Sequence, residues 1–240
     1  VICVPSAITA VEQRAVREAA RRAGAAEAHL LEQPMAAAIG AGLPIEHPVG
    51  NMVIDIGGGT SETALISLGG VVALEAVRVG SFDVDAAIQT HVRREHGIAV
   101  GEQTAEQIKL AIGSAHASDE PWSAEVRGRE LMSGLPRTVE LTTPEVRQAI
   151  DEPVSAMVDS VVSCLGSAPP ELAQDLIVRG IHLVGGGGML RGLGTRIAEA
   201  AHVPVTLVDQ PLEAVVLGAG QCVESFEEVR DMFMTSRTRR

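Results

Sequence analysis

Residues 51–70, NMVIDIGGGTSETALISLGG, decide the fold that this sequence predicts. An apolar run ends at Asp55, three glycines follow, and a run rich in Thr, Leu and Ile then resumes. Glycine allows a sharp turn, and short apolar runs bounded by glycine are typical of strands, so we expect strands over 52–56 and 60–68. The glycine pair that ends the stretch suits a two-residue hairpin turn, which predicts a third strand over 71–79 and therefore a meander.

The first glycine turn has the chemistry of a phosphate and magnesium site. Consecutive glycine amides can converge on an anion because no Cβ obstructs them. The carboxylate of Asp55, at the end of the first strand, can hold Mg²⁺ through bound water. Glycine turns are also common in hairpins that bind no ligand, so this stretch alone favours phosphate binding and a plain hairpin equally.

A second glycine cluster at 185–188 strengthens the case for a nucleotide. It follows a predicted strand over 181–184 and precedes a predicted helix over 193–201 and a strand over 203–208, an order typical of a parallel unit. The N-terminus of a helix attracts a phosphate or a polar purine edge, because its amides are unpaired and its dipole is positive there. Alone, the cluster is better explained by packing of strand against helix, but together with Asp55 it favours a nucleotide cleft.

Composition and charge narrow the possible functions. The 240 residues are enough for one large domain or two modest ones. A formal net charge of −12 and a pI near 5.0 argue against a surface for nucleic acid, which would have to neutralise phosphates. No apolar stretch approaches the ~20 residues that a membrane helix needs, and the start has no signal-peptide pattern. We therefore expect a soluble, cytoplasmic protein.

The cysteines and histidines give no metal site by their spacing. Cys3, Cys164 and Cys222 lie too far apart for a ligand motif, and an odd number cannot complete a disulfide framework, so we expect buried thiols. The histidines without ligand spacing, to which we assign no role, are His29, His91, His96, His116, His182 and His202.

Before residue 50, strands and helices alternate, which predicts a parallel layer. The predicted elements are a strand over 1–4, a helix opened by a capping box of Thr9 and Glu12 and ending at Gly24, a strand over 28–31, and a helix over 35–39 with Pro34 in its first turn. A segment rich in Pro then separates this layer from the glycine-turn stretch.

After residue 80, helices and one hairpin follow. The predicted elements are a helix over 81–96 capped by Ser81, a helix ending at 112 and opened by a capping box of Thr104 and Gln107, a hairpin with arms 125–132 and 138–142, a helix over 143–166, and a helix over 212–222. Pro153 predicts a kink or break in the long helix. The basic tail at 236–240 is expected to be solvated.

A series of motifs runs through the chain in a fixed order. They read LEQPMAAAIGAGLP, NMVIDIGGGTSE, AEQIK followed by IGSA, GLPRTV, EPVSA and GGGGMLRGL. On these motifs, over nearly its whole length, the chain resembles the MreB/Mbl family of bacterial actin-like cell-shape proteins. It is more loosely similar to actin, the heat-shock chaperone ATPases and the sugar kinases. The resemblance implies an α/β fold of the actin-like (ribonuclease H-like) ATPase class, in which two lobes close on ATP and Mg²⁺.

The resemblance also divides the chain into parts. It implies that 1–49 are the remainder of the first lobe (subdomain IA), 50–80 and 144–210 the core of the second lobe (IIA), 81–143 an inserted subdomain (IIB), and 211–240 a helix returning to the first lobe plus the basic tail. Family members begin with a strand and an Asp-x-Gly turn, the first phosphate loop, which the resemblance places before Val1 together with the membrane-binding segments. We therefore expect an incomplete first lobe, and weak or no ATP binding by these residues alone, because several charge-assisted hydrogen bonds would be missing.

The resemblance assigns ligand contacts around both glycine clusters. It implies that Asp55 holds Mg²⁺ through water. The second phosphate loop would comprise Gly57, Gly58, Gly59 and Thr60, and the adenosine cradle would comprise Gly185, Gly186, Gly187 and Gly188. The family's Glu-x-x-Lys motif falls on Glu106, Gln107, Ile108 and Lys109, which would reach the ribose and adenine. On spacing alone, Glu106 and Lys109 are better explained as a solvated ion pair one helical turn apart.

Catalysis is placed by the resemblance on Gln33 and Thr60. In the family, a glutamate before the Pro-Met-Ala-Ala-Ala run orients the attacking water together with the first threonine of the phosphate loop. Gln33 stands at the glutamate position, where actin also has glutamine. A neutral amide can position a water but cannot take up its proton, so we expect an altered rate of hydrolysis. The neighbouring Glu32 is expected to point to the opposite face of its strand.

Three functions are open at this point. The first is an ATP-dependent cytoskeletal protein whose filaments direct cell-wall synthesis and rod shape. Its partners would be further copies of itself, cell-shape and cell-wall synthesis proteins and the inner face of the membrane, and ATP hydrolysis would accompany polymerisation in the full-length protein. The second is a kinase of the same fold, for which we find no base aspartate near the first lobe. The third is a truncated, non-hydrolysing subunit, to which Gln33 and the expected absence of the first loop both point.

Overall fold

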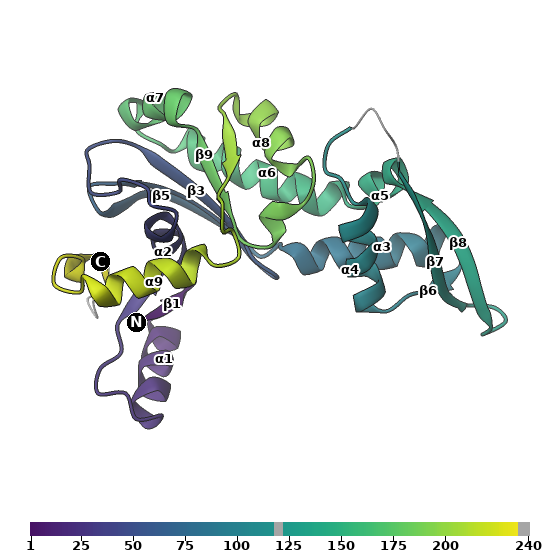
Figure 1. Ribbon diagram of the computed structural model, residues 1–240, viewed down its shortest axis with the longest axis horizontal. Coiled ribbons are helices and arrows are strands. Elements are labelled where there is room, and N and C mark those ends of the chain that lie inside the picture. The colour runs from purple at the N-terminus through teal and green to yellow at the C-terminus, as the bar shows by residue number, and fades with distance from the viewer. Residues whose placement is uncertain (118–121, 235–240) are drawn as a thin grey trace.

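The computed structural model describes residues 1–117 and 122–234, which form three sheets with helices packed between them (Figure 1). The strands are β1 (Ile2–Val4), β2 (Leu30–Glu32), β3 (Asn51–Ile56), β4 (Ser61–Ser67), β5 (Gly70–Val77), β6 (Ile98–Ala99), β7 (Ser123–Glu130), β8 (Pro136–Thr142), β9 (Ile181–Val184) and β10 (Val205–Leu207). The α-helices are α1 (Ala10–Arg22), α2 (Gln33–Gly40), α3 (Ser81–Glu95), α4 (Glu102–Ile112), α5 (Thr143–Ala149), α6 (Asp151–Gly166), α7 (Pro170–Arg179), α8 (Leu193–Ala201) and α9 (Ala214–Glu224). Two 3₁₀ turns are η1 (Gly187–Met189) and η2 (Arg230–Met232). The predicted solvated tail at 236–240 lies outside the described residues.

The central sheet has the strand order β10-β9-β3-β4-β5. Its strands β3, β4 and β5 form the predicted antiparallel meander, whereas β9 pairs in parallel with both β3 and β10. The predicted parallel unit after residue 180 is therefore confirmed. Every residue of β3 and β4 is buried, because helices cover both faces of the sheet.

Alternate residues of β3 face two separate hydrophobic cores. Met52 and Ile54 pack with residues of α6 and α8, among them Met157. Val53 packs in the other core with residues of α2 and α9, among them Met35. Figure 1 shows α6, α7 and α8 on one side of the sheet and α2 and α9 on the other. A register slip by one residue would turn the residues that face one core toward the other. The hydrophobic pattern therefore fixes the register of β3 against its neighbours, and with it the position where each strand ends.

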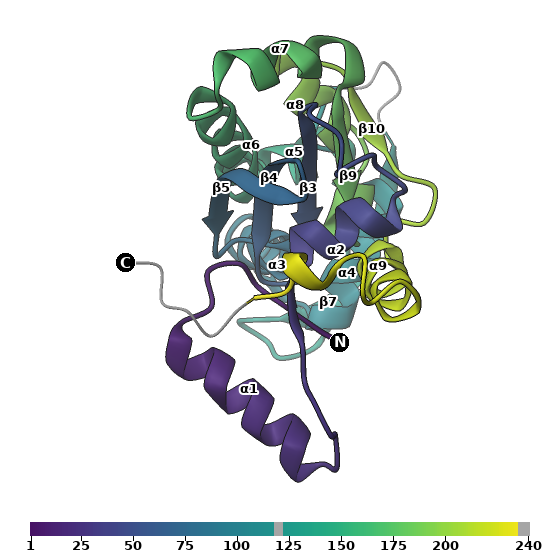
Figure 2. The same ribbon diagram turned by 90° about the vertical axis from the view of Figure 1, so that its left-hand side faces the viewer.

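The first two strands form a separate parallel pair connected by α1, as predicted for the start of the chain. The predicted capping box is confirmed, since the Thr9 hydroxyl accepts from the Glu12 amide and the Glu12 carboxylate accepts from the Thr9 amide at 2.8 Å. No residue of α1 is buried, and the helix projects away from the other elements in both views (Figures 1 and 2).

Two glycines allow α2 and α9 to pack in direct backbone contact. A Cβ on Gly218 would lie 1.9 Å from the carbonyl oxygen of Ala36, and a Cβ on Gly40 would lie 1.9 Å from that of Ala214. No side chain fits at either position. The end of the described chain is thereby held against its beginning, and Figure 2 shows the two helices side by side.

Replacing Gly218 by alanine should lower the free energy of unfolding by about 1–3 kcal/mol, because the two helices must separate to admit the methyl group. Gly220→Ala is the matched control two residues further along α9, since a Cβ there meets nothing within 4 Å. Alanine is the better helix former, so the control should be neutral or stabilising by up to about 1 kcal/mol. Urea unfolding followed by circular dichroism would measure both, and equal stabilities would contradict the packing argument.

The predicted cap of α3 is wrong by one residue. Gly80, not Ser81, is the N-cap, and its amide donates to the Asp83 carboxylate at 2.8 Å. The Ser81 hydroxyl oxygen instead accepts from Lys109, whose ammonium lies 2.6 Å away. Ser81 therefore serves a tertiary contact and leaves the capping role to its neighbours.

The predicted capping box of Thr104 and Gln107 is also wrong. The helix α4 begins at Glu102 with the extended Gly101 as its N-cap, so both predicted residues lie inside the helix. Glycine is accepted at the N-cap, and an acidic residue in the first turn complements the helix dipole, which favours the earlier start.

The long helix predicted after residue 142 is broken, in agreement with the effect expected of Pro153. The helix α5 ends at Ala149, Ile150 leaves the helical conformation with ψ near 3°, and α6 starts at Asp151. Pro153 then lies in the first turn of α6, where it is tolerated because first-turn amides lack an acceptor within the helix.

The third sheet, in the order β6-β7-β8, lies beside α3 and α4 at the opposite end of the molecule from α1 (Figure 1). Its strands β7 and β8 form the predicted hairpin. Cys164 and Cys222 are buried, as predicted, whereas Cys3 is only half-buried. Among the described helices, none has both the length and the apolar character needed to cross a bilayer.

Candidate functional site

The two glycine clusters meet at one edge of the central sheet. Because β3 and β9 are parallel neighbours with Asp55 opposite Val184, both glycine turns begin at the same edge. Gly185 has a φ of +81°, and a Cβ there would lie 2.6 Å from Asp55 Oδ1 and 2.3 Å from the carbonyl oxygen of Ile56. Only glycine allows both this backbone conformation and this close approach. The fold thus places the second cluster directly against Asp55.

Five backbone amides in these two turns are free to donate. Within residues 1–117 and 122–234, no acceptor is found for the amides of Gly58, Gly59, Thr60, Gly186 and Gly187. Unpaired amides of successive residues in a turn form a binding site for anions, because their partial positive charges converge. Two such groups at one sheet edge can contact neighbouring parts of one polyanion.

The start of α3 holds the first glycine turn in place. The amides of Ser81 and Phe82 donate to the carbonyl oxygens of Gly57 and Gly58 at 3.0 and 2.8 Å. A Cβ on Gly80 would lie 2.4 Å from the Gly58 carbonyl oxygen, so the helix start and the turn are in backbone contact. A turn that is already ordered loses little conformational entropy when a ligand binds.

Asp55 shares its face of the sheet with a second buried carboxylate. Glu62 lies directly opposite Asp55 in the antiparallel pair, and opposite residues point to the same face. Asp55 is 9% exposed and Glu62 is 2% exposed. Burial, and secondly the charge of Glu62, raise the pKa of Asp55 to about 6. Among the described residues, neither carboxylate has an ion-pair partner.

This environment fits a hydrated divalent cation next to Asp55. Two buried carboxylates repel each other, and Mg²⁺ would relieve that repulsion while accepting oxygen ligands and keeping its waters. Glu62 already accepts two hydrogen bonds from the Ser6 amide, at 3.1 and 3.3 Å, and these oppose the rise in its pKa that burial causes. Asp55 is therefore the carboxylate that is available for a cation.

Lys109, the only lysine of the chain, is buried between α3 and α4. Its ammonium lies 2.9 Å from the Asp85 carboxylate and 2.6 Å from Ser81 Oγ. Burial raises the pKa of Asp85, and the hydrogen bond from Lys109 acts in the opposite direction. Because the partner of the ammonium is Asp85, the alternative of a solvated ion pair with Glu106 is wrong.

A small cavity of about 70 Å³ connects Lys109 with the second glycine cluster. Ser81 and Lys109 line it on one side and Gly186 and Gly187 on the other, with Met157 among its apolar wall residues. Apolar walls with a few convergent polar groups are typical of small-molecule sites. The enclosed volume suits one edge of a ribose or a purine better than a whole nucleoside.

Arg191, in the segment that follows the second glycine cluster, forms hydrogen bonds with the end of α4. Its guanidinium donates to the carbonyl oxygens of Leu110 and Gly113 at 3.2 Å each and to that of Ala111 at 2.5 Å. It also lies 4.1 Å from the ring centroid of Trp122, within range of a cation–π interaction. These contacts keep the helix that carries Lys109 against residues 185–188.

The remaining predicted site residues differ in burial, and two of them make no direct hydrogen bond to each other. Gln33 is half-buried in the first turn of α2, Thr60 is half-buried just before β4, and no hydrogen bond joins them in the part of the chain that the structure describes. Glu106 and Gln107 are exposed on α4, whereas Ile108 is buried in a hydrophobic core. The roles of these residues stay predictions.

Glu62, Asp85 and Arg191 were missed by the sequence reasoning. A hairpin that turns at the glycines pairs residues symmetrically, so the position of Glu62 opposite Asp55 was already contained in the sequence. Asp85 is four residues from Ser81 and therefore on the same face of α3, but nothing in the sequence pairs it with Lys109. No sequence pattern marks Arg191 as part of the site, because its role depends on where the end of α4 lies in the folded chain.

Comparison with known proteins gives one consistent family. Residues 1–231 match the family profile described as MreB/Mbl protein. Over 226 residues the chain is 48% identical to the cell shape-determining protein MreB of Escherichia coli strain K12, which covers 94% of this chain and 65% of that protein. The chain thus spans 65% of the length of this curated relative.

Solved structures agree with this result. The crystal structure of MreB5 of Spiroplasma citri bound to ADP has a TM-score of 0.91 and 32% identity, and the match covers 95% of this chain and 70% of that chain. The same protein bound to AMPPNP has a TM-score of 0.90 and 32% identity, covering 95% and 69%. A MamK double helical filament has a TM-score of 0.74 at 22% identity, covering 93% and 69%, and at that identity it shows a shared fold alone.

Proposed function

The chain belongs to the MreB/Mbl protein family, and from this we propose that it is an ATP-binding, actin-like cytoskeletal protein. The predicted actin-like α/β fold is confirmed by the structural matches. Its filaments would direct cell-wall synthesis and rod shape, and the name of its E. coli relative, cell shape-determining protein MreB, supports a role in cell shape. The observation in this chain that carries the proposal is the set of five unpaired amides, from two distant glycine turns, beside the buried Asp55.

The nucleotide would lie across the shared edge of β3 and β9. In this proposal the loop of Gly57, Gly58, Gly59 and Thr60 contacts the β- and γ-phosphates, and Gly185, Gly186, Gly187 and Gly188 cradle the adenosine. A relative at 32% identity is solved with ADP and with AMPPNP, which supports a nucleotide with several phosphates. Mg²⁺ would be held by Asp55 through water and would neutralise phosphate charge.

The helix α4 would supply the ribose and base contacts. Lys109 lines the cavity beside Gly186, and the exposed Glu106 and Gln107 lie on the same helix. The side chain of Ile108 packs in the core, so it would contribute by holding α4 in place. Asp85 would keep the Lys109 ammonium charged and aligned, since the pair is hydrogen-bonded at 2.9 Å.

Hydrolysis would depend on the positioning of water, and its rate would differ from that of relatives with glutamate at position 33. Gln33 and Thr60 are our candidates for orienting the attacking water, because both stand at the family positions and both are partly accessible. An amide side chain can donate and accept hydrogen bonds but cannot act as a general base at neutral pH. We propose that hydrolysis accompanies polymerisation in the complete protein.

The domain assignment follows the same family pattern. We propose that 1–49 belong to subdomain IA, 50–80 and 144–210 to IIA and 81–143 to IIB, with 211–240 returning to IA. The separate sheets β1-β2 and β6-β7-β8 on either side of the central sheet support this division, and so does the packing of α9 on α2. The filaments would lie in the cytoplasm at the inner face of the membrane, with cell-shape and cell-wall synthesis proteins as partners and without nucleic acid.

Replacing Gly59 by alanine tests the phosphate loop without disturbing the fold. A Cβ at this position meets nothing within 4 Å, and the backbone there has no positive φ, so the variant should be as stable as the parent. The added methyl group lies among the unpaired amides, so Mg-ATP affinity should fall about tenfold or more, which corresponds to about 1.4 kcal/mol. Isothermal titration calorimetry of the complete protein would measure this, because these residues alone are expected to bind ATP weakly or not at all.

The control for this experiment is Gly166→Ala at the end of α6, where a Cβ also meets nothing within 4 Å. It should leave affinity unchanged, and stability unchanged or higher by up to about 1 kcal/mol, because alanine is the better helix former. Sedimentation and electron microscopy with and without ATP would test in parallel whether nucleotide promotes filaments. Equal Mg-ATP affinity of the Gly59 variant, the Gly166 variant and the parent would refute the proposed phosphate site.

A further inference from the structure

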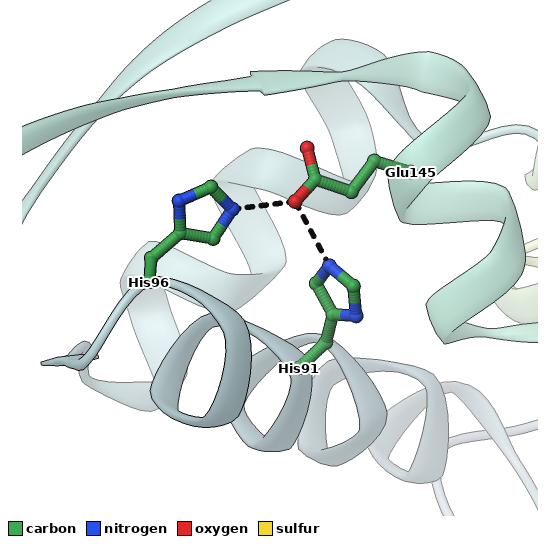
Figure 3. A group of neighbouring side chains, drawn as sticks. All are labelled: His91, His96 and Glu145. Carbon is green, nitrogen blue, oxygen red and sulfur yellow. Dashed lines mark hydrogen bonds and ion pairs between the residues drawn. The ribbon is translucent and has the colours of Figure 1, made fainter.

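Two histidines and a glutamate converge at the C-terminal end of α3 (Figure 3), whereas the start of α3 holds the first glycine turn. Glu145 Oε1 lies 3.0 Å from His91 Nε2 and 2.5 Å from His96 Nε2. The three side chains are partly buried, with exposures of 18% for His91, 24% for His96 and 25% for Glu145. Figure 3 shows both rings directed at the same carboxylate oxygen.

The fold brings these residues together from two helices. His91 lies in the last turns of α3 and His96 is its C-cap, so both rings leave the same end of that helix. Glu145 lies in the first turn of α5, where its Oε2 accepts weakly from the Thr142 amide at 3.5 Å. Its other oxygen is therefore left to face the histidines. The spacing of the histidines gave no ligand motif because the third group comes from a distant segment.

The donor set is one that transition metals prefer. One ligand atom of each residue lies within 4.8 Å of the other two. Imidazole nitrogens combined with a carboxylate oxygen suit Zn²⁺ and its first-row neighbours, and His₂Glu sites leave a fourth position open. With ligand bonds of about 2.0–2.1 Å, a tetrahedral ion needs ligand atoms roughly 3.3 Å apart. To reach that spacing, the carboxylate oxygen would have to withdraw by roughly 0.3 Å from His91 Nε2 and roughly 0.8 Å from His96 Nε2.

Without a cation, the arrangement requires each ring to place a proton between its Nε2 and the same oxygen. Metal ligands must be deprotonated, so a bound cation would displace both of these protons.

The cluster opens into a cavity of about 930 Å³. Three further carboxylates line this cavity, those of Asp83, Glu95 and Glu152, against one guanidinium, that of Arg94. The excess of negative charge favours entry of a cation, and the volume leaves room for water or another ligand at the open position.

We propose that His91, His96 and Glu145 bind a zinc-like divalent cation whose fourth coordination position faces this cavity. The site is distinct from the one at Asp55, because Ser81 and His96 lie at opposite ends of α3, roughly 20 Å apart at 1.5 Å per residue. A bound ion would tie the end of α3 to α5. Since the start of α3 holds the first glycine turn, the ion would brace the helix that supports the phosphate loop.

The thiols are the main competitors for the same metals. Burial raises the pKa of Cys3 and of Cys164 to about 11 and raises that of Cys222 as well, so none is a ready thiolate at neutral pH. Cobalt(II) separates the two kinds of site by its spectrum. Nitrogen and oxygen ligands give visible d–d bands alone, whereas thiolate ligands add an intense charge-transfer band in the near ultraviolet.

The test is titration of the purified chain with Zn²⁺ by calorimetry, and with Co²⁺ by absorption spectroscopy. We expect one saturable Zn²⁺ site, d–d bands without thiolate charge transfer, and at least a tenfold loss of affinity in His96→Gln and in His91→Gln. His116→Gln is the matched control, because His116 also pairs with a glutamate, Glu199 at 3.1 Å, but has no second histidine in its cluster. Its affinity should equal that of the parent.

Circular dichroism of each variant establishes that it is folded before it is titrated, and His96→Asn provides a second variant if His96→Gln fails. Thermal unfolding of the parent should shift upward with Zn²⁺, and that of the folded His96 variant should not. Unchanged affinity in both histidine variants, a thiolate charge-transfer band, or no saturable binding would each overturn the proposal and leave the cluster as a hydrogen-bonded link between two helices.

Discussion

Replacing Lys109 by methionine should lower the free energy of unfolding by about 3–5 kcal/mol and abolish measurable Mg-ATP binding. Removing one partner of a buried ion pair leaves the other charge without compensation, and that penalty is of this size. Here the stranded group would be the Asp85 carboxylate, whose side chain is 11% exposed. The variant also removes the only ammonium from the cavity beside Gly186 and Gly187. Urea unfolding and calorimetry would measure the two losses separately.

A double variant separates the structural loss from the functional one. Asp85→Asn combined with Lys109→Met removes both charges, so part of the stability should return, because no buried charge is left uncompensated although a buried amide remains. Binding should not return, because the ammonium is still missing. Arg93→Met, which removes an exposed cation from α3, should change stability by no more than about 0.5 kcal/mol. Full Mg-ATP binding by the double variant would contradict the role proposed for Lys109.

Replacing Asp55 by asparagine should have opposite effects on stability and on function. The pKa of Asp55 rises from 3.8 to about 6 on folding, so its ionised form is unfavourable in the folded chain. At about 1.4 kcal/mol per pKa unit, removing that charge should stabilise the apoprotein by up to about 3 kcal/mol at pH 7. The same variant should lose Mg²⁺-dependent ATP binding, because the carboxylate proposed to hold the hydrated ion is gone.

The pH dependence of this effect has a definite sign. In the folded state Asp55 binds its proton more tightly than in the unfolded state, so folding is favoured when the group is protonated. The destabilisation is absent below a pH of about 4, develops between about 4 and about 6, and is complete above. The stability difference between Asp55→Asn and the parent should grow over that window and then level off. Asp159→Asn, at an exposed position of α6, should show no such growth. A pH-independent difference would show that Asp55 is not the buried acid described here.

The elements of the central sheet could be predicted because their signals are local. The run from Asn51 to Ile56 is apolar, ends in glycines and is buried on both faces, so propensity, burial and turn chemistry agree. The pairing of the meander follows from its short turns. The break at Ile150 follows from Pro153, whose ring restricts the backbone whatever surrounds it.

Helix starts were less predictable where a side chain had a distant partner. Ser81 has the composition of a cap but accepts from Lys109, which lies 28 residues away. The helix α7 was not predicted, although Pro170 in its first turn is a signal that could have been read. Leu176 is its one buried residue, whereas Ile177 and Val178 are exposed, so its apolar residues gave little indication of a buried helix face.

The candidate site likewise contains some residues that the sequence could predict and others that it could not. The glycine turns and Asp55 are recognisable because each motif is continuous in sequence. The groups that complete the site are not, since the partner of Lys109 is 24 residues away and that of His91 is 54 residues away. Such pairs depend on how helices pack, and a single sequence contains no local record of that packing.

Because the only lysine of the chain is buried, its chemical reactivity reports how often the structure around it opens. An amine-reactive acylating reagent finds no other lysine to modify, and in the folded state this one is 9% exposed and held by Asp85 and Ser81. Its rate of acylation therefore counts the openings that separate α3 from α4. Mass spectrometry of this one modified side chain would then measure how often the part of the molecule beside the second glycine cluster opens, without any engineered label.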